Sequence, residues 1–196
     1  MSSKTRLFYN RIAIFYPIIG YFLKRHRKLV IDEVNKTLPG DLLEIGVGNG
    51  AHLALYTTHK ITGIDISERM LNKASRFAKS NIALRVMDGE NLLFAESTFD
   101  YVVICHVLAV TNDPEQLLRQ VFKVLKPGGR LFILNHFTPA NWFRYIDIMF
   151  QPAAALLHFK SAFFLKQIKA LQQFTLIKER SAGIGSYFKI LIYAKS

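Results

Sequence analysis

The sequence LLEIGVGNG, residues 42–50, predicts a buried strand that runs directly into a glycine-rich turn. Two known spacings coexist in this turn. Gly46, Gly48 and Ala51 fit G-x-G-x-x-A, the spacing of a dinucleotide site. Gly46, Gly48 and Gly50 also fit G-x-G-x-G. The turn alone therefore leaves two enzyme classes open, namely hydride transfer and methyl transfer.

Short apolar runs alternate with helical patterns after this turn. The expected strands are LLEIG (42–46), ITGID (61–65), ALRVM (83–87), FDYVVIC (99–105) and RLFILN (130–135). The expected helices are AHLALYTT (51–58), SERMLNKASRFAKS (67–80) and DPEQLLRQVFKVLK (113–126). Ser67 and Asp113 are expected N-caps, and Pro114 falls at a first helical position. Nearly continuous apolar strands separated by helices indicate a parallel sheet that is covered on both faces.

The C-terminal pattern differs, because FTLIKERSA (174–182) and GSYFKILIYAK (185–195) are two β-rich runs close together. They predict an antiparallel hairpin that closes the sheet. We therefore expect an α/β fold with a doubly wound, Rossmann-like sheet in a single domain. The expected parts are N-terminal basic and aromatic helices (1–38), a cofactor-binding core (40–136), and a helical lid followed by the hairpin (137–196).

The composition fits a folded domain, since 51% of the 196 residues are hydrophobic and only 20% are charged. A single cysteine, Cys105, excludes an internal disulfide and fits a reducing compartment. No Cys/His cluster has the spacing of a zinc site, so we expect no metal.

The net charge of +12 is confined to the two ends of the chain. Residues 1–36 and 137–196 each carry +6, whereas residues 37–136 are neutral. This placement predicts an anionic partner at the ends, either lipid headgroups or nucleic acid, with a solvated basic surface as the alternative. His26, inside the basic run KRHRK, is expected on the surface.

The longest apolar run, IAIFYPIIGYFL (12–23), is too short to cross a membrane as a helix. Twelve helical residues span about 18 Å, against a hydrocarbon core of about 30 Å. No small-residue cleavage site follows the run, which argues against a signal peptide. We expect an amphipathic or buried helix that can lie on a membrane surface.

Acidic residues at the expected strand ends bear on the choice of cofactor. Glu44 precedes the glycine turn and would repel a pyrophosphate, whereas S-adenosylmethionine carries a sulfonium, an amine and a carboxylate but no phosphate. Asp65 ends the second strand and can accept both ribose hydroxyls, a role common to NAD and S-adenosylmethionine sites. Asp88, within MDGENLLF (87–94), is placed to accept from an adenine amino group.

Four features follow one another in the chain: the glycine turn (46–50), Asp65, Asp-Gly-Glu-Asn (88–91) and Lys-Pro-Gly-Gly (126–129). In this order they resemble the class I S-adenosylmethionine-dependent methyltransferases over residues 40–136. The resemblance implies a seven-stranded sheet with its last strand antiparallel, and S-adenosylmethionine as cofactor with S-adenosylhomocysteine as product. A dehydrogenase is the alternative. The implied cofactor contacts are Glu44, Gly46, Gly48, Asp65, Met70, Asp88 and Gly89. Further expected cofactor-binding residues are Tyr9, Ile66, Glu90, Cys105 and His106.

The flanks of the core bear on the methyl acceptor. FYNRIAIFYP (8–17) resembles the Y-x-x-x-A-x-x-Y-D opening of quinone-ring C-methyltransferases and of small bacterial phosphatidylethanolamine N-methyltransferases. Tyr9, Ala13 and Tyr16 match this opening, but Pro17 stands where an Asp is usual.

The second flank resembles the phosphatidylethanolamine N-methyltransferases more specifically. LNHF (134–137) is followed by FQPAAALLHFKSAFFLKQI (150–168), an apolar stretch that leads into an aromatic-rich helix start. The expected function is therefore N-methylation of phosphatidylethanolamine and its partly methylated forms. The alternative is C- or O-methylation of a quinone-type or other small apolar acceptor.

Direct displacement by the acceptor amine is the expected reaction. Tyr9 and Tyr16 are expected to orient the amine, and His136 to accept its proton or bind the lipid phosphate. The expected substrate-binding residues are Arg144, Lys160 and Tyr187.

The expected partners are the phospholipid substrate and an anionic membrane surface, with the chain cytoplasmic and peripherally attached to the inner face of the cell membrane. No obligate protein partner is evident. A nucleic-acid methyltransferase is disfavoured because no Asn/Asp-Pro-Pro-Tyr/Phe motif is present. A non-catalytic cofactor-binding protein is a third alternative, which a turnover assay would reveal.

Overall fold

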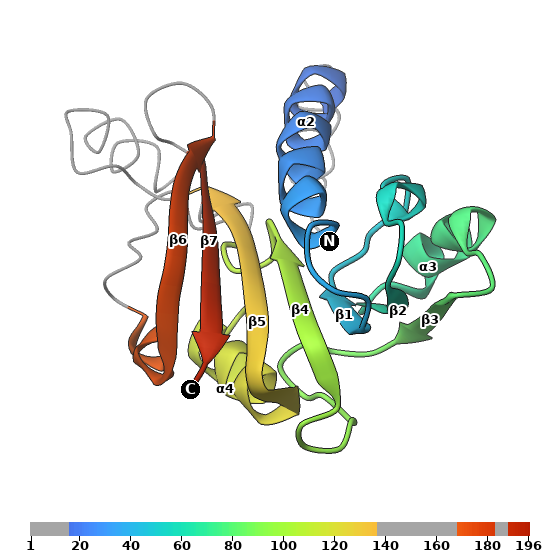
Figure 1. The fold of residues 1–196 in the computed structure, drawn as a ribbon. Coiled ribbons are helices and arrows are strands. Elements are labelled where there is room, and N and C mark those ends of the chain that lie inside the picture. The colour runs from blue at the N-terminus through green and yellow to red at the C-terminus, as the bar shows by residue number, and fades with distance from the viewer. Residues whose placement is uncertain (1–15, 137–167, 183–187) are drawn as a thin grey trace.

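The computed structural model describes residues 16–136, 168–182 and 188–196, which form one seven-stranded sheet with the order β3-β2-β1-β4-β5-β7-β6 (Figure 1). The strands β1 to β5 are parallel, and β7 lies antiparallel between β5 and β6. The strands are β1 (Asp41–Ile45), β2 (Lys60–Asp65), β3 (Ile82–Val86), β4 (Phe99–Cys105), β5 (Leu125–His136), β6 (Phe174–Ala182) and β7 (Phe188–Lys195). The expected topology and the C-terminal hairpin are confirmed.

Helices cover both faces of the sheet, as the sequence pattern predicts. The helices are α2 (Tyr16–Val34), α3 (Glu68–Ala74) and α4 (Pro114–Val124), and the 3-10 turns are η1 (Leu53–Leu55), η2 (Ser75–Phe77) and η4 (Lys169–Gln173). Leu43 and Ile45 of β1 pack in the cluster that contains α4, whereas Leu42 packs in the cluster that contains α2 and α3. Each fully buried Leu or Ile side chain contributes about 1.5–3 kcal/mol to stability.

Both expected helix N-caps are confirmed. The Ser67 hydroxyl accepts a hydrogen bond from the Met70 amide at 3.3 Å, and the Asp113 carboxylate accepts from the Gln116 amide at 2.9 Å. Pro114 occupies the first turn of α4, where its missing N–H has no intrahelical partner to lose.

Two expected helices are shorter in the structure. Residues 51–58 form only the turn η1, because Asn35, the residue after α2, takes the hydrogen-bonding groups that a longer helix would use. Its amide nitrogen donates to the Leu55 carbonyl at 2.9 Å, and its oxygen accepts from the Thr57 amide at 3.3 Å. The helix expected over 67–80 changes to η2 after Ala74, where the Ser75 hydroxyl donates to the Asn72 carbonyl at 3.0 Å.

The fifth strand begins earlier than expected. The sequence predicts a helix to residue 126 and a strand from residue 130, but β5 starts at Leu125, which pairs with Phe99 across an irregular register. The expected helical lid and the residues before Tyr16 lie outside the described residues. Among the described helices, none is both long and apolar enough to cross a membrane.

Candidate functional site

The glycine turn after β1 is folded tightly against neighbouring elements. Gly46, Gly48 and Gly50 have φ values of +75°, +56° and +68°, a region that other residues rarely adopt. A Cβ at Gly46 would lie 2.4 Å from Cγ2 of Val107, so only glycine fits there. A Cβ at Gly48 would meet nothing within 4 Å, so the backbone at Gly48 is open to a ligand.

Asp65, the last residue of β2, fixes this turn. Its Oδ2 accepts from the Gly48 amide at 2.8 Å, and its Oδ1 accepts from the Ser67 amide at 2.9 Å. A carboxylate offers about four lone-pair sites, so each oxygen can still accept from a ligand hydroxyl. The structure therefore leaves Asp65 able to bind a ribose, as the sequence predicts.

A cavity of about 360 Å³ lies at the carboxyl ends of the parallel strands, beside the point where the strand order reverses between β1 and β4. Open α/β sheets bind ligands at this position. Eight of the expected cofactor residues line it: Gly46, Asp65, Ile66, Asp88, Gly89, Glu90, Cys105 and His106.

The other expected residues fall elsewhere. Gly48 and Met70 do not line the cavity, and Met70 is 41% exposed on α3. Tyr16 is the first residue of α2 and His136 the last residue of β5, and their proposed roles stay predictions. Four residues lie outside the described part of the chain: Tyr9, Arg144, Lys160 and Tyr187.

Glu44 is fully buried behind the cavity rather than lining it. Its carboxylate binds the imidazole of His52 at 2.5 Å and accepts from the Tyr56 hydroxyl at 2.9 Å. Burial acts to raise the pKa of Glu44, but His52, Arg27 and Tyr56 outweigh burial and hold the pKa below its ordinary value. Glu44 is therefore an ionised carboxylate that stabilises the glycine turn from the core, through its contacts to His52 and Tyr56 just after the turn.

Sequence reasoning missed Arg27, which lines the cavity from α2. One signal was available, because Arg27 lies three, four and seven residues before the buried Val30, Ile31 and Val34, on the same helix face. The expectation that His26 lies on the surface is wrong. His26 is only 6% exposed and stacks on Phe188 with ring centroids 4.6 Å apart.

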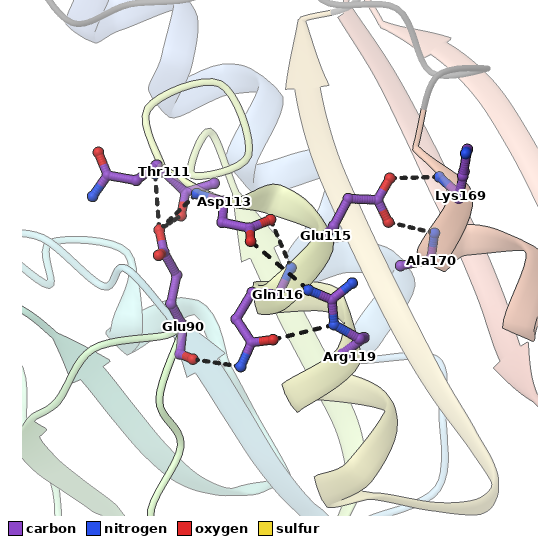
Figure 2. Close-up of polar contacts among 9 residues, drawn as sticks. Glu90, Thr111, Asp113, Glu115, Gln116, Arg119, Lys169 and Ala170 are labelled. Carbon is purple, nitrogen blue, oxygen red and sulfur yellow. Dashed lines mark hydrogen bonds and ion pairs between the residues drawn. The ribbon is translucent and has the colours of Figure 1, made fainter.

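A loop after β4 forms the remaining wall of the cavity and was also missed. The lining residues of this loop are Val107, Val110, Thr111 and Asn112. Figure 2 shows how Glu90 holds the loop: its Oε1 accepts from the Thr111 hydroxyl and from the amides of Asn112 and Asp113, at 2.8 and 3.1 Å. The Thr111 hydroxyl and these amides keep the pKa of Glu90 below its ordinary value despite partial burial.

The first turn of α4, which follows this loop, also binds a segment that is distant in the sequence. Glu115, in the first turn of α4, accepts from the consecutive amides of Lys169 and Ala170 at 2.6 and 2.7 Å (Figure 2). These two amides open η4, so the chain that follows residues 137–167 is fixed beside the cavity loop.

Cys105, the last residue of β4, and His106, the residue after it, also line the cavity. The backbone conformation of His106 and the pKa of Cys105 both differ from ordinary values. His106 has φ +62°, a left-handed conformation that is uncommon outside glycine, although histidine adopts it more often than most residues. Burial raises the pKa of Cys105 to about 12, although the Arg27 guanidinium acts in the opposite direction. The Cys105 thiol is therefore not a nucleophile at neutral pH.

The charges around the cavity suit a nucleoside without phosphates. Asp65, Asp88 and Glu90 would repel a pyrophosphate, but each can accept hydrogen bonds from hydroxyl or amino groups. Among the described residues, no group of three His, Cys, Asp or Glu could hold a metal ion. S-adenosylmethionine fits this set, because Asp65 could accept from its ribose hydroxyls and Asp88 from its adenine amino group.

Comparisons with known proteins agree with this chemistry. A family model for a methyltransferase domain matches residues 43–133. The chain carries a class I S-adenosylmethionine-dependent methyltransferase domain. A solved S-adenosylmethionine-dependent methyltransferase from Thermotoga maritima has the same fold, with a TM-score of 0.68 at 21% identity over 96% of this chain and 98% of that one.

Curated relatives of this methyltransferase domain fall into two groups. The chain is 35% identical over 136 residues to the phosphatidylethanolamine N-methyltransferase of Cereibacter sphaeroides, covering 66% of each protein. It is 34% identical over 132 residues to the ubiquinone/menaquinone biosynthesis C-methyltransferase UbiE of Desulfotalea psychrophila, covering 65% of this chain and 54% of that protein. The chain thus spans at most about two thirds of the length of these relatives.

Proposed function

We propose that this methyltransferase domain N-methylates phosphatidylethanolamine and its partly methylated forms at a membrane surface. The observation that carries the proposal is the 35% identity to the phosphatidylethanolamine N-methyltransferase of Cereibacter sphaeroides. When bound, S-adenosylmethionine supplies a methyl group on a sulfonium, which an amine lone pair can displace.

Contacts between the two basic ends of the chain support a lipid surface as partner. Glu33 of α2 binds Lys178 of β6 at 2.9 Å and lies 3.9 Å from Nη1 of Arg180. Phe188, at the start of β7, packs on His26 of α2. The described parts of both ends therefore contact each other, so basic residues of α2 and of β6 lie in one region. Each basic residue near an anionic surface contributes about 1 kcal/mol.

The acceptor amine must lose a proton before it can react. A primary ammonium has a pKa of about 10, so the site has to favour the neutral amine and align it with the methyl group. We assign the alignment to Tyr9 and Tyr16, and proton acceptance or phosphate binding to His136. Arg144, Lys160 and Tyr187 complete the proposed substrate set.

Methylation of a quinol ring is the second candidate function. It is supported by the 34% identity to UbiE and by 30% identity to the demethylmenaquinone methyltransferase of Tropheryma whipplei. Both candidates share the cofactor cavity and differ only in the acceptor.

A methyl-transfer assay with each acceptor in turn separates the two candidate functions. The purified chain is incubated with methyl-labelled S-adenosylmethionine and detergent micelles that contain either phosphatidylethanolamine or a demethylmenaquinol. We expect label in mono-, di- and trimethylated phospholipid, and much less label with the Asp65→Asn control. Label in the quinol alone would overturn the proposal.

Vesicle binding tests the membrane partner independently of turnover. The chain should sediment with vesicles that contain anionic phospholipid and should detach as salt rises, because exposed charges are screened. Equal sedimentation with purely zwitterionic vesicles at all salt concentrations would contradict the electrostatic attachment.

A further inference from the structure

Arg27 is the only Lys or Arg among the described residues that line the cavity. The other charged lining residues are the carboxylates of Asp65, Asp88 and Glu90. S-adenosylmethionine carries one anionic group, the carboxylate of its amino-acid part. The cavity therefore presents a single guanidinium for a single carboxylate, and an Arg fork matches a carboxylate with two parallel hydrogen bonds.

A buried chain of hydrogen bonds orients this guanidinium. Nη1 of Arg27 donates to Nδ1 of His52 at 3.0 Å. Because a guanidinium only donates, Nδ1 must accept, and the ring proton lies on Nε2, which donates to Glu44. Glu44 is held in turn by the Tyr56 hydroxyl. These contacts connect the side chain of Arg27, on α2, through His52 to Glu44 on β1.

This arrangement leaves donors of Arg27 available for a ligand. His52 takes one of the five N–H groups, the guanidinium also contacts the Cys105 thiol, and the buried Nε has no hydrogen-bond partner among the described residues. An unsatisfied buried donor is costly, so a group that accepts from the guanidinium would be stabilised there.

The direction of the cofactor across the sheet agrees with this position. If the ribose binds Asp65 at the end of β2, the amino-acid part could reach across β1 toward the end of β4. β2 and β4 are separated by two strand spacings, about 10 Å. Arg27 lies at the β4 side, beside Cys105.

We infer that Arg27 binds the carboxylate of the amino-acid part of S-adenosylmethionine, and that His52 and Glu44 are its positioning residues. The inference depends on the cofactor of the family and not on the lipid acceptor. It also assigns α2 a second task, because cofactor binding then ties this helix to the glycine turn.

Binding calorimetry with two ligands tests the assignment without any acceptor. S-adenosylhomocysteine carries the carboxylate, whereas 5′-deoxy-5′-methylthioadenosine lacks the amino-acid part. We expect Arg27→Met to weaken S-adenosylhomocysteine about 10- to 100-fold and to leave methylthioadenosine within about twofold. Arg27→Lys should lose less, and Arg130→Met, on the opposite edge of the sheet, should change neither ligand.

The positioning role has its own readout. His52→Gln should weaken S-adenosylhomocysteine by less than Arg27→Met does, because the guanidinium remains but is poorly oriented, and methylthioadenosine should again be unaffected. The inference is overturned if both Arg27 variants bind the two ligands with equal losses, or if they bind both as the wild type does. Either outcome leaves the choice between phospholipid and quinol acceptors untouched, since no acceptor is present.

Discussion

Two cavities of similar volume lie on opposite edges of the same sheet, and only one has the chemistry of a site. The cavity at the carboxyl edge measures about 360 Å³ and the one at the amino edge about 380 Å³. The amino-edge cavity is lined by Lys36, Thr37, Leu38, Asp100, Tyr101, Lys126, Pro127, Gly128, Gly129 and Arg130. Volume therefore does not separate the two, and the difference lies in how their charges are paired.

At the amino edge the acidic lining residue, Asp100, is paired with a cation. Lys126 binds Asp100 at 2.8 Å, and the other oxygen of Asp100 accepts from the Asp41 amide at 2.9 Å. Burial acts to raise the pKa of Asp100, but Lys126 and the Asp41 amide outweigh it and hold the pKa below its ordinary value. This pairing fixes the start of β1 against β4 and β5, which is a structural task.

At the carboxyl edge the acidic groups are held by backbone amides instead. Asp65, Asp88 and Glu90 accept from backbone amides, and within the described ranges none of the three forms an ion pair with Lys or Arg. Their negative charge remains available to hydroxyl and amino groups of a ligand. Parallel strands thus produce a binding edge and a structural edge from one sheet.

The largest expected effect comes from Asp65→Asn. An amide has only one acceptor oxygen, so either Gly48 or Ser67 loses its partner and the ribose site loses its charge. We expect the Kd of S-adenosylhomocysteine to rise about 10- to 100-fold, measured by calorimetry. Asp100→Asn is the matched control, because this carboxylate also accepts a backbone amide. It should lower the free energy of unfolding but leave the Kd unchanged, and an equal rise in Kd would contradict the comparison.

A second test compares two glycines with the same strain. Gly48 and Gly128 have φ values of +56° and +73°, and a Cβ at either would meet nothing within 4 Å. Gly48→Ala and Gly128→Ala should each lower the free energy of unfolding by about 1–2 kcal/mol, measured with urea. Only Gly48→Ala should also weaken S-adenosylhomocysteine. Weaker binding in Gly128→Ala would argue against a purely structural amino edge.

Glu90→Gln should have a smaller effect. The Gln oxygen can still accept from Thr111 and the loop amides, but without charge these hydrogen bonds are weaker. We expect about 1 kcal/mol less stability and a loss of affinity of several-fold, since the cavity wall remains in place. Arg119→Met, which removes an exposed contact to Gln116 and an exposed ion pair with Asp113 at 3.8 Å, serves as the control and should retain wild-type affinity.

The smallest effect is expected for Lys126→Met. The pair with Asp100 is over one third exposed on the Lys side, so it contributes about 1 kcal/mol or less. Because the pKa of Asp100 is lowered in the folded state, its contribution is present above the ordinary value of 3.8 and is lost as the pH falls through the lower folded value. Urea unfolding should show a difference between wild type and variant at neutral pH that shrinks as the pH falls below 3.8. A difference that grows in acid would contradict this sign.

Local signals in the sequence predicted most of the fold. The strand patterns, the caps at Ser67 and Asp113 and the C-terminal hairpin depend on nearby residues, and all three are confirmed. The helix expected over 51–58 failed for a non-local reason. Asn35, from the turn after α2, binds the Leu55 carbonyl and the Thr57 amide.

The site residues also divide into those that local sequence predicts and those that depend on distant contacts. Motif spacing located Gly46, Asp65 and Asp88, because each lies at a strand end whose position the sequence specifies. Arg27 could not be found by spacing to that motif, because its place depends on how α2 packs on the sheet. Glu44 was expected to contact the cofactor, but it is buried behind the cavity with His52 and Tyr56, and this burial depends on the turn that folds back over it.

A crystal structure of the chain with S-adenosylhomocysteine tests the central claim most directly. The account predicts the ligand in the carboxyl-edge cavity, with its ribose hydroxyls within hydrogen-bonding distance of Asp65 and the purine toward Asp88. A ligand in the amino-edge cavity, or one whose ribose lies away from Asp65, would contradict it.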